Sequence, residues 1–316
     1  MLKNRVLVKL VRLGTPVLRP FERRVLERAT TTGMPPPIMV VGPPRSGTTL
    51  LYRILTESFA TAHFVRLCSA LPETPVTAVQ LARRLRLEDS KGNIDNHYGQ
   101  SAGWASPHEA GVVWRRWLPT EDPDRQAALP PREHPATLRA TIAALSALTG
   151  GAPFVSKNLS NSFFLERIYD AVGPMLVIRC RRDPADTALS ILRGRLDHVS
   201  RPNQWWSIRP PGWRAAAEKP VEDQIAFQIS STREAIKRAE KQLLPGGCRF
   251  IDATYEDFAL EPRTLVDAVS EEYVLMPRAR IEATAAVPSG TVPSSRQADT
   301  GLERRVANRV EDWHGE

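Results

Sequence analysis

Short apolar runs alternate along the chain with longer stretches in which apolar residues recur every three or four positions. The short runs, several of them rich in β-branched residues, predict strands at residues 38–41, 62–67, 153–157, 175–179 and 249–253. The longer periodic stretches predict helices at residues 48–58, 77–87, 136–148, 161–172 and 221–243. Strands that alternate with helices predict an α/β fold, a three-layer sandwich of the P-loop type with a central parallel sheet flanked by helices.

The turn after the first predicted strand carries the clearest candidate chemistry. A strand, a turn with Gly42 and Gly47, and a helix that begins at Thr48 leave backbone N–H groups directed at one spot. The helix dipole favours negative charge there, so a phosphate or sulfate group is the predicted ligand. The glycine spacing nearly matches the nucleotide-binding loop of kinases, but Thr48 stands where those enzymes need lysine, and the cation is Arg45. This favours a 5′-phosphate with one further anionic group over a metal-bridged triphosphate; an ordinary turn is the alternative.

The sequence Pro44-Arg45-Ser46-Gly47-Thr48-Thr49-Leu50 resembles the 5′-phosphosulfate loop of sulfotransferases that use 3′-phosphoadenosine 5′-phosphosulfate (PAPS). The second signature of that family, Arg-Asp-Pro and a serine eight residues after the arginine, is matched by Arg182-Asp183-Pro184 and Ser190. The resemblance covers residues 36 to 272 and implies a sulfuryl-transfer enzyme that takes PAPS as donor and needs no metal. The nucleotide-binding residues that it implies are Pro44, Arg45, Ser46, Gly47, Thr48, Thr49, Arg182, Ser190 and Tyr255.

A candidate general base lies between the two signatures, in the segment Ser106-Pro107-His108-Glu109. The segment resembles the Ser-Pro-x-Glu of bacterial members of the family, whose acid faces the acceptor. Glu109 would then take the proton of the acceptor hydroxyl, with His108 as the second candidate. Serine, proline and an acid three residues after the serine also predict a helix start, so capping alone is the alternative role of Glu109. Relatives of the tyrosylprotein sulfotransferases place a glutamate soon after the first helix, where the nearest acid here is Glu73.

Two further features bear on the transfer step and on the acceptor. Lys157 resembles the strand-end lysine of the family, which would neutralise charge on the bridging oxygen as the donor leaves. The alternative is a solvated lysine at a strand end. The segment 198–218 holds Trp205, Trp206 and Trp213 among prolines. It predicts either an acceptor-binding lid or a small satellite of the core.

Two parts of the family pattern are altered. Some relatives carry an arginine twelve residues after the first arginine of the second signature. This chain has Gly194 there, between Arg193 and Arg195, and either arginine is a candidate substitute. The tail takes the place of the last cofactor loop of the family without its usual sequence, which leaves Ser289 and Arg296 as weakly indicated candidates.

Composition excludes several classes of protein. Of 316 residues, 42% are hydrophobic and 25% are charged, which is typical of a globular protein and not of a disordered one. Three scattered cysteines give no disulfide framework and favour a reducing, cytoplasmic location. Neither zinc-ligand spacing nor an apolar run of 18 residues is present, so we expect no structural metal and no membrane-spanning helix.

The net charge of +8 is concentrated at the start of the chain. Residues 1–28 hold eight basic and two acidic side chains, a net charge of +6, on a pattern of short helices. They are predicted either to rest on an anionic membrane surface or to pack on the domain or a partner subunit. We expect residues 1–34 to form this basic segment, residues 35–316 to form one catalytic domain, and nucleic acid not to be a partner.

Two other functions fit parts of the pattern. A nucleotide-dependent kinase fits the glycine loop but not Thr48 or the second signature. A catalytically inactive nucleotide-binding module fits the basic N-terminal segment but leaves Glu109 and Lys157 without a role.

Overall fold

The computed structural model describes residues 15–87, 103–120, 123–126, 132–199, 201–284 and 300–311. Four parallel strands form its sheet in the order β2-β1-β3-β4. They are β1 (Ile38–Val41), β2 (Val155–Lys157), β3 (Leu176–Arg181) and β4 (Arg249–Thr254). Ile38 pairs with Val155 on one side and with Leu176 on the other. The parallel sheet expected from the sequence is confirmed.

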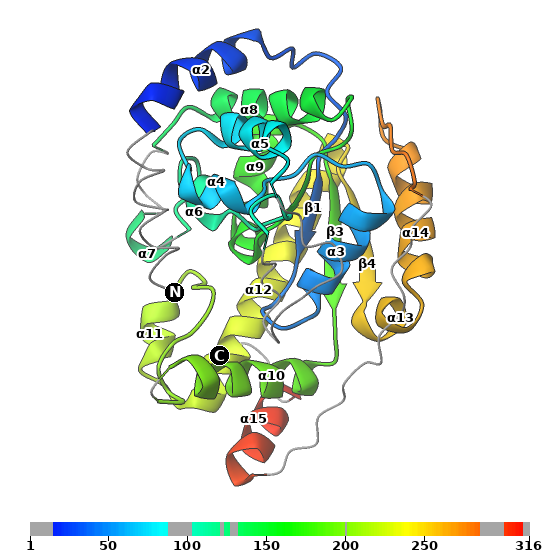
Figure 1. Ribbon diagram of the computed structural model, residues 1–316. Helices are drawn as coiled ribbons and strands as arrows, with labels where there is room; N and C mark the ends of the chain where they lie inside the picture. Colours follow the sequence, from blue (N-terminus) through cyan, green and yellow to red (C-terminus); the bar gives the residue numbers. More distant parts are fainter. Residues whose placement is uncertain are drawn as a thin grey trace.

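Helices cover both faces of this sheet, which gives three layers (Figure 1). Successive side chains of a strand point to opposite faces. Met39 and Val41 pack in one core, whereas Ile38 and Val40 pack in another. The first core is covered by α8 (Pro135–Leu148), α9 (Leu165–Val172) and α12 (Val221–Leu243), with α4 (Arg66–Ala70), α5 (Pro75–Arg84) and α6 (Gly111–Trp114) beside them. The second is covered by α3 (Thr48–Ser58), α13 (Tyr255–Leu260) and α14 (Pro262–Val274).

The remaining helices lie at the two ends of the sheet. At the bottom of Figure 1, where the strands end, are α10 (Pro184–His198) and α15 (Gly301–Glu311), which pack on α12. At the top is α2 (Thr15–Arg28), which contacts α5 and α8. Shorter elements are α7 (Pro123–Gln126), α11 (Trp213–Ala217), η1 (Leu159–Phe163) and η2 (Leu244–Gly246).

One predicted strand is wrong. Residues 62–67 make only two isolated bridges, Ala62 to Phe154 and Val65 to Pro107, and the chain then turns into α4. Each bridge meets a different partner segment, so no ladder extends along this stretch. The helix predicted at 161–172 is also divided, because Asn158 caps η1 through Ser160 N and α9 begins only at Leu165.

No helix in the described part of the chain is long and apolar enough to cross a membrane. The division of the chain into residues 1–34 and 35–316 stays a prediction.

Candidate active site

The candidate site is built where the four strands end. Strand β1 leads into the loop that starts at Gly42, β2 ends at Lys157, β3 is followed by Arg182, and β4 by Tyr255. Because the strands are parallel, their carboxyl ends meet at one edge of the sheet, which is where open α/β sheets bind ligands.

The loop between β1 and α3 has the geometry of an anion site. Ser46 Oγ donates to the carbonyl of Pro43 over 2.8 Å, so the loop closes on itself. Gly47 caps α3 with φ of 100° and no side-chain bond, which leaves the N–H groups of the first turn for a ligand. A Cβ at this position would lie 2.4 Å from the ring of Tyr255, so only glycine fits. Arg45, with φ of 65°, holds a conformation that is strained for a residue with a side chain.

The two sequence signatures are in direct contact. Arg45 Nε donates to Ser190 Oγ over 3.0 Å, and Arg182 Nη1 donates to the carbonyl of Arg45 over 3.2 Å. The Arg182 guanidinium carbon stands 4.5 Å from the centre of the Tyr255 ring. Asp183 starts α10 by accepting from Asp186 N over 2.9 Å, which places Ser190 on the second turn of that helix. The structure therefore brings together Arg45, Arg182, Ser190 and Tyr255 from three separate segments of the chain.

Lys157 lies on the other side of the same loop. Its Nζ donates to Thr49 Oγ1 over 3.0 Å and forms an ion pair with Glu109. The Lys157 side chain is 5% exposed, so it is not a solvated strand-end lysine, whereas Glu109 is 46% exposed. The lysine thus joins the start of α3 to an acid that solvent, or an acceptor, can reach.

The helix start predicted at Ser106 is wrong. Pro107 pairs with Val65, and His108 N donates to the carbonyl of Phe64 over 2.9 Å, so the segment is extended. Ala110 then takes φ of 47°, and α6 begins only at Gly111. Pairing with residues 64 and 65 outweighs the local capping signal. Glu109 therefore precedes the helix and does not cap it, which removes the alternative role for this carboxylate.

His108 is adjacent to Glu109 but differs in chemistry. Its Nδ1 accepts from Ala110 N over 3.0 Å and lies 3.1 Å from Ser69 Oγ. Burial lowers the pKa of His108, the largest effect on it. A neutral imidazole whose Nδ1 accepts an N–H carries its proton on Nε2. In this arrangement neither ring nitrogen is a free base.

The candidate substitutes for the missing second arginine lie elsewhere. Arg193 Nε pairs with Glu303 of α15 at 2.9 Å. Arg195 is fully buried, and its Nη1 donates to Gln224 Oε1 over 2.7 Å; burial lowers the pKa of Arg195 to about 10. Glu73, the nearest acid after the first helix, pairs with Arg19 of α2 and takes no part in the site. The candidates Ser289 and Arg296 lie outside the described residues.

One neighbour of the loop and one contact on α10 were not anticipated from the sequence. Cys180 Sγ donates to the carbonyl of Ser46 over 2.9 Å, and burial raises the pKa of this thiol to about 12. It is therefore a structural support of the loop and not a nucleophile. On α10, a Cβ at Gly194 would lie 2.7 Å from the ring of Trp206, so the tryptophan packs on this glycine. No group of side chains in the described ranges is suited to hold a metal ion.

Comparison with known proteins identifies the family. A family model described as the sulfotransferase family matches residues 36–272, most of the chain. The chain belongs to the sulfotransferase family. Membership makes it a sulfuryl-transfer enzyme, and both signatures lie within the matched residues.

Two solved sulfotransferases share the fold at low identity. STF9 from Mycobacterium avium is 16% identical with a TM-score of 0.52, over 96% of this chain and 74% of that one. STF1 from Mycobacterium tuberculosis H37Rv is 15% identical with a TM-score of 0.55, over 97% of this chain and 79% of that one. The likeness confirms the α/β fold. Comparison with curated proteins gives no match.

Proposed function

We propose that the enzyme moves the sulfuryl group of PAPS onto a hydroxyl of a small-molecule, carbohydrate or lipid acceptor. The observation that carries this proposal is the pair of contacts made by one loop. Its Arg45 reaches Ser190 of the second signature, and its Thr49 reaches Lys157, which is paired with Glu109. Nucleotide anchors, anion loop, cation and candidate base therefore adjoin one another.

The residues present fit an anionic nucleotide donor. The N–H groups at the start of α3, with Arg45 and Lys157, would hold the sulfate and the 5′-phosphate. Arg182 and Ser190 would hold the 3′-phosphate, since a guanidinium can grip a phosphate with two parallel bonds. Tyr255 would lie beside the nucleotide, where it already packs on Gly47 and under Arg182. Pro44, Ser46 and Thr48 complete the loop.

When bound, PAPS supplies an activated sulfuryl group on a good leaving group. Glu109 takes the proton of the acceptor hydroxyl as the new sulfur–oxygen bond forms and the bond to the 5′-phosphate breaks. Lys157 is placed to interact both with the base and with the leaving group, because its Nζ contacts the Glu109 carboxylate and the Thr49 hydroxyl at the start of the anion loop helix. As negative charge develops on the leaving oxygen, the ammonium group stabilises it.

The acceptor would bind against the loop of residues 201–213. Trp206 packs on Gly194, one helical turn beyond Ser190 on the same face of α10. Its carbonyl accepts from Gln228 Nε2 over 3.0 Å, which holds the loop to α12. A tryptophan fixed beside the nucleotide helix is a suitable platform for a sugar or an apolar alcohol.

The location follows from the thiols. All three cysteines are free and buried, as in proteins of a reducing compartment, so a cytoplasmic enzyme is part of the proposal.

Calorimetry with two nucleotides tests the donor. We expect 3′,5′-bisphosphoadenosine to bind the wild type about ten- to a hundredfold more tightly than AMP, the worth of a charge-assisted bidentate contact. Arg182→Ala should remove most of this preference. Equal affinities in the wild type would rule the proposal out, and tight magnesium-dependent ATP binding would indicate a kinase. Nucleotide binding without turnover of PAPS on a broad acceptor panel would indicate an inactive module.

A further inference from the structure

Helix α2 is held to the domain by a buried carboxylate, in addition to the packing of its Leu18, Val25 and Leu26 on the core. Glu22 is 3% exposed, and its Oε1 accepts from Val76 N over 3.0 Å. Its Oε2 accepts from both Thr77 N and Thr77 Oγ1 over 2.7 Å. These N–H groups belong to the first turn of α5, so Glu22 caps a helix other than its own. The orientation of α2 is therefore set, and one of its faces is held away from the domain.

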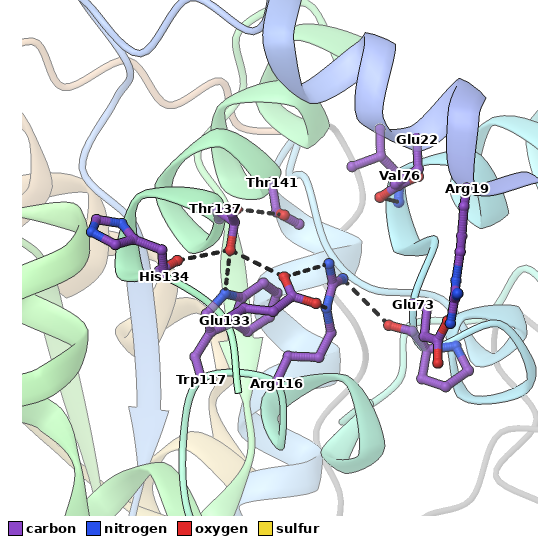
Figure 2. Close-up of polar contacts among 11 residues, drawn as sticks. Arg19, Glu22, Glu73, Val76, Arg116, Trp117, Glu133, His134, Thr137 and Thr141 are labelled. Atoms are coloured by element: carbon purple, nitrogen blue, oxygen red, sulfur yellow. Dashed lines mark hydrogen bonds and ion pairs between the residues drawn. The ribbon is translucent and has the colours of Figure 1, made fainter. Parts of the chain in front are cut away.

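The charges on the inner side of α2 are satisfied within the chain. A hollow of about 370 Å³ separates α2 from α8, and Leu26, Ala136 and Ala140 are among the residues that line it. Around it Arg19 pairs with Glu73, Arg23 with Glu27, and Arg116 with Glu133 (Figure 2 shows the first and last of these). This hollow offers apolar space, and these three ion pairs occupy most of the charged side chains that line it.

The outer side of α2 is different. Val17 and Phe21 are 68% and 61% exposed, and Arg24 and Arg28 are exposed beside them. The four positions i, i+4, i+7 and i+11 form one stripe along a helix. Within the described part of the chain neither arginine of this stripe forms an ion pair. Two apolar side chains and two arginines thus face solvent together.

We propose that this stripe of Val17, Phe21, Arg24 and Arg28 docks the enzyme on an anionic lipid surface. Arg24 and Arg28 give this stripe two positive charges, and Glu22 is turned inward, so the stripe itself holds no acid. The positive charge of Arg24 and Arg28 fits anionic headgroups, and the exposed side chains of Val17 and Phe21 can enter the boundary between headgroups and acyl chains. A nucleic acid would use the arginines but not the two apolar side chains.

The position of α2 suits this role. It lies at the opposite end of the sheet from α10 and α15, which stand at the carboxyl edge with the candidate site (Figure 1). Docking through α2 would leave the nucleotide loop open to solvent. The surface is independent of the proposed chemistry.

Sedimentation with vesicles tests the proposal on the full chain. We expect the wild type to bind vesicles of phosphatidylcholine with phosphatidylglycerol, to bind phosphatidylcholine alone far less, and to be released by salt. Arg24→Gln with Arg28→Gln should weaken binding about thirtyfold, since each arginine near an anionic surface contributes roughly a factor of five. Val17→Ser with Phe21→Ser should weaken vesicle binding at low salt as well, because this variant removes apolar contacts that salt does not screen.

The matched control is Lys237→Gln with Lys241→Gln, which removes the same charge from exposed positions of α12. It should bind vesicles nearly as well as the wild type. If the arginine variant and the lysine variant lost vesicle affinity equally, net charge alone would explain the binding, and the assignment to α2 would be overturned. Absence of sedimentation at low salt, or binding to DNA but not to vesicles, would overturn it too. Affinity for 3′,5′-bisphosphoadenosine should be the same in all variants, which shows that each is folded and separates this proposal from the enzymatic one.

Discussion

At the scale of single residues, Glu109 and His108 are adjacent but differ in their ability to accept a proton from the acceptor. Glu109 is half exposed and bound to Lys157. His108 is turned inward, with Nδ1 accepting from Ala110 N and a pKa lowered by burial. Only the carboxylate combines access with an available lone pair.

Glu109→Gln is therefore expected to lower turnover by about 10²–10⁴-fold, the usual contribution of a positioned general base. Glutamine keeps the shape of the side chain but cannot take the proton. Steady-state kinetics would measure the loss, with calorimetry showing that nucleotide affinity is retained. Because glutamine leaves the buried Lys157 without its ion-pair partner, the melting temperature should fall, so turnover is compared per folded molecule. Turnover near that of the wild type would place the base elsewhere, and a matching loss in His108→Gln alone would point to the histidine.

At the scale of elements, the contact of Glu22 on α2 with the first turn of α5 makes a contribution to the free energy of unfolding that can be measured directly. Glu22→Ala would leave the N–H groups of Val76 and Thr77 buried without partners, which costs about 1–3 kcal/mol. Urea unfolding would measure this loss. A loss within experimental error would mean that α2 is only loosely held.

Glu22→Gln isolates the charge. Burial raises the pKa of Glu22 above its ordinary value of 4.5, so the folded state holds the proton more tightly than the unfolded state does. The stability that this group contributes is therefore present below about pH 4.5 and is lost as the pH rises through the folded pKa. We expect the free energy of unfolding of the glutamine variant, relative to wild type, to increase with pH over that range. A pH-independent difference would show that the carboxylate ionises normally in the fold.

The local pattern of apolar and polar residues was sufficient to predict the sheet and its long helices. The apolar run 38–41 became β1, and the periodic stretch 221–243 became α12, because both are strongly patterned and end at turn residues. The stretch 62–67 has the same composition as a strand, yet it found only isolated partners. The capping signal at Ser106 also lost to pairing with Val65. In both cases contacts distant in sequence decided the conformation.

Much the same holds for the site. The anion loop and the Arg182 signature could be predicted because their chemistry lies in short, contiguous motifs. The ion pair of Lys157 with Glu109, and the packing of Tyr255 on Gly47, join residues far apart in the chain. No spacing rule encodes such contacts. The sequence also offered Arg193 as a phosphate ligand, but its partner Glu303 lies in a helix that the pattern did not indicate.

At the scale of the whole molecule, the candidate site is where segments distant in the sequence contact one another. Arg45 bonds Ser190, 145 residues further along, and Lys157 bonds Thr49, 108 residues back. The anion loop is thus held against α10 on one side and β2 on the other, and Tyr255 ties in the segment after β4. A ligand that binds all of these residues should stabilise the domain as one unit.

Thermal unfolding with and without nucleotide tests whether the domain unfolds as one cooperative unit. At a concentration of 3′,5′-bisphosphoadenosine one hundred times its Kd, linkage stabilises the folded state by about 2.7 kcal/mol. For a chain of this size that corresponds to a rise in Tm of about 5 °C. We expect one calorimetric transition that shifts as a whole, a much smaller shift for Arg182→Ala at the same nucleotide concentration, and no further shift on adding magnesium. Two transitions of which only one moves would divide residues 35–316 into separate domains. An equal shift with magnesium and ATP would return the kinase to consideration, because a loop with Thr48 in place of lysine should gain little from a metal-bridged triphosphate.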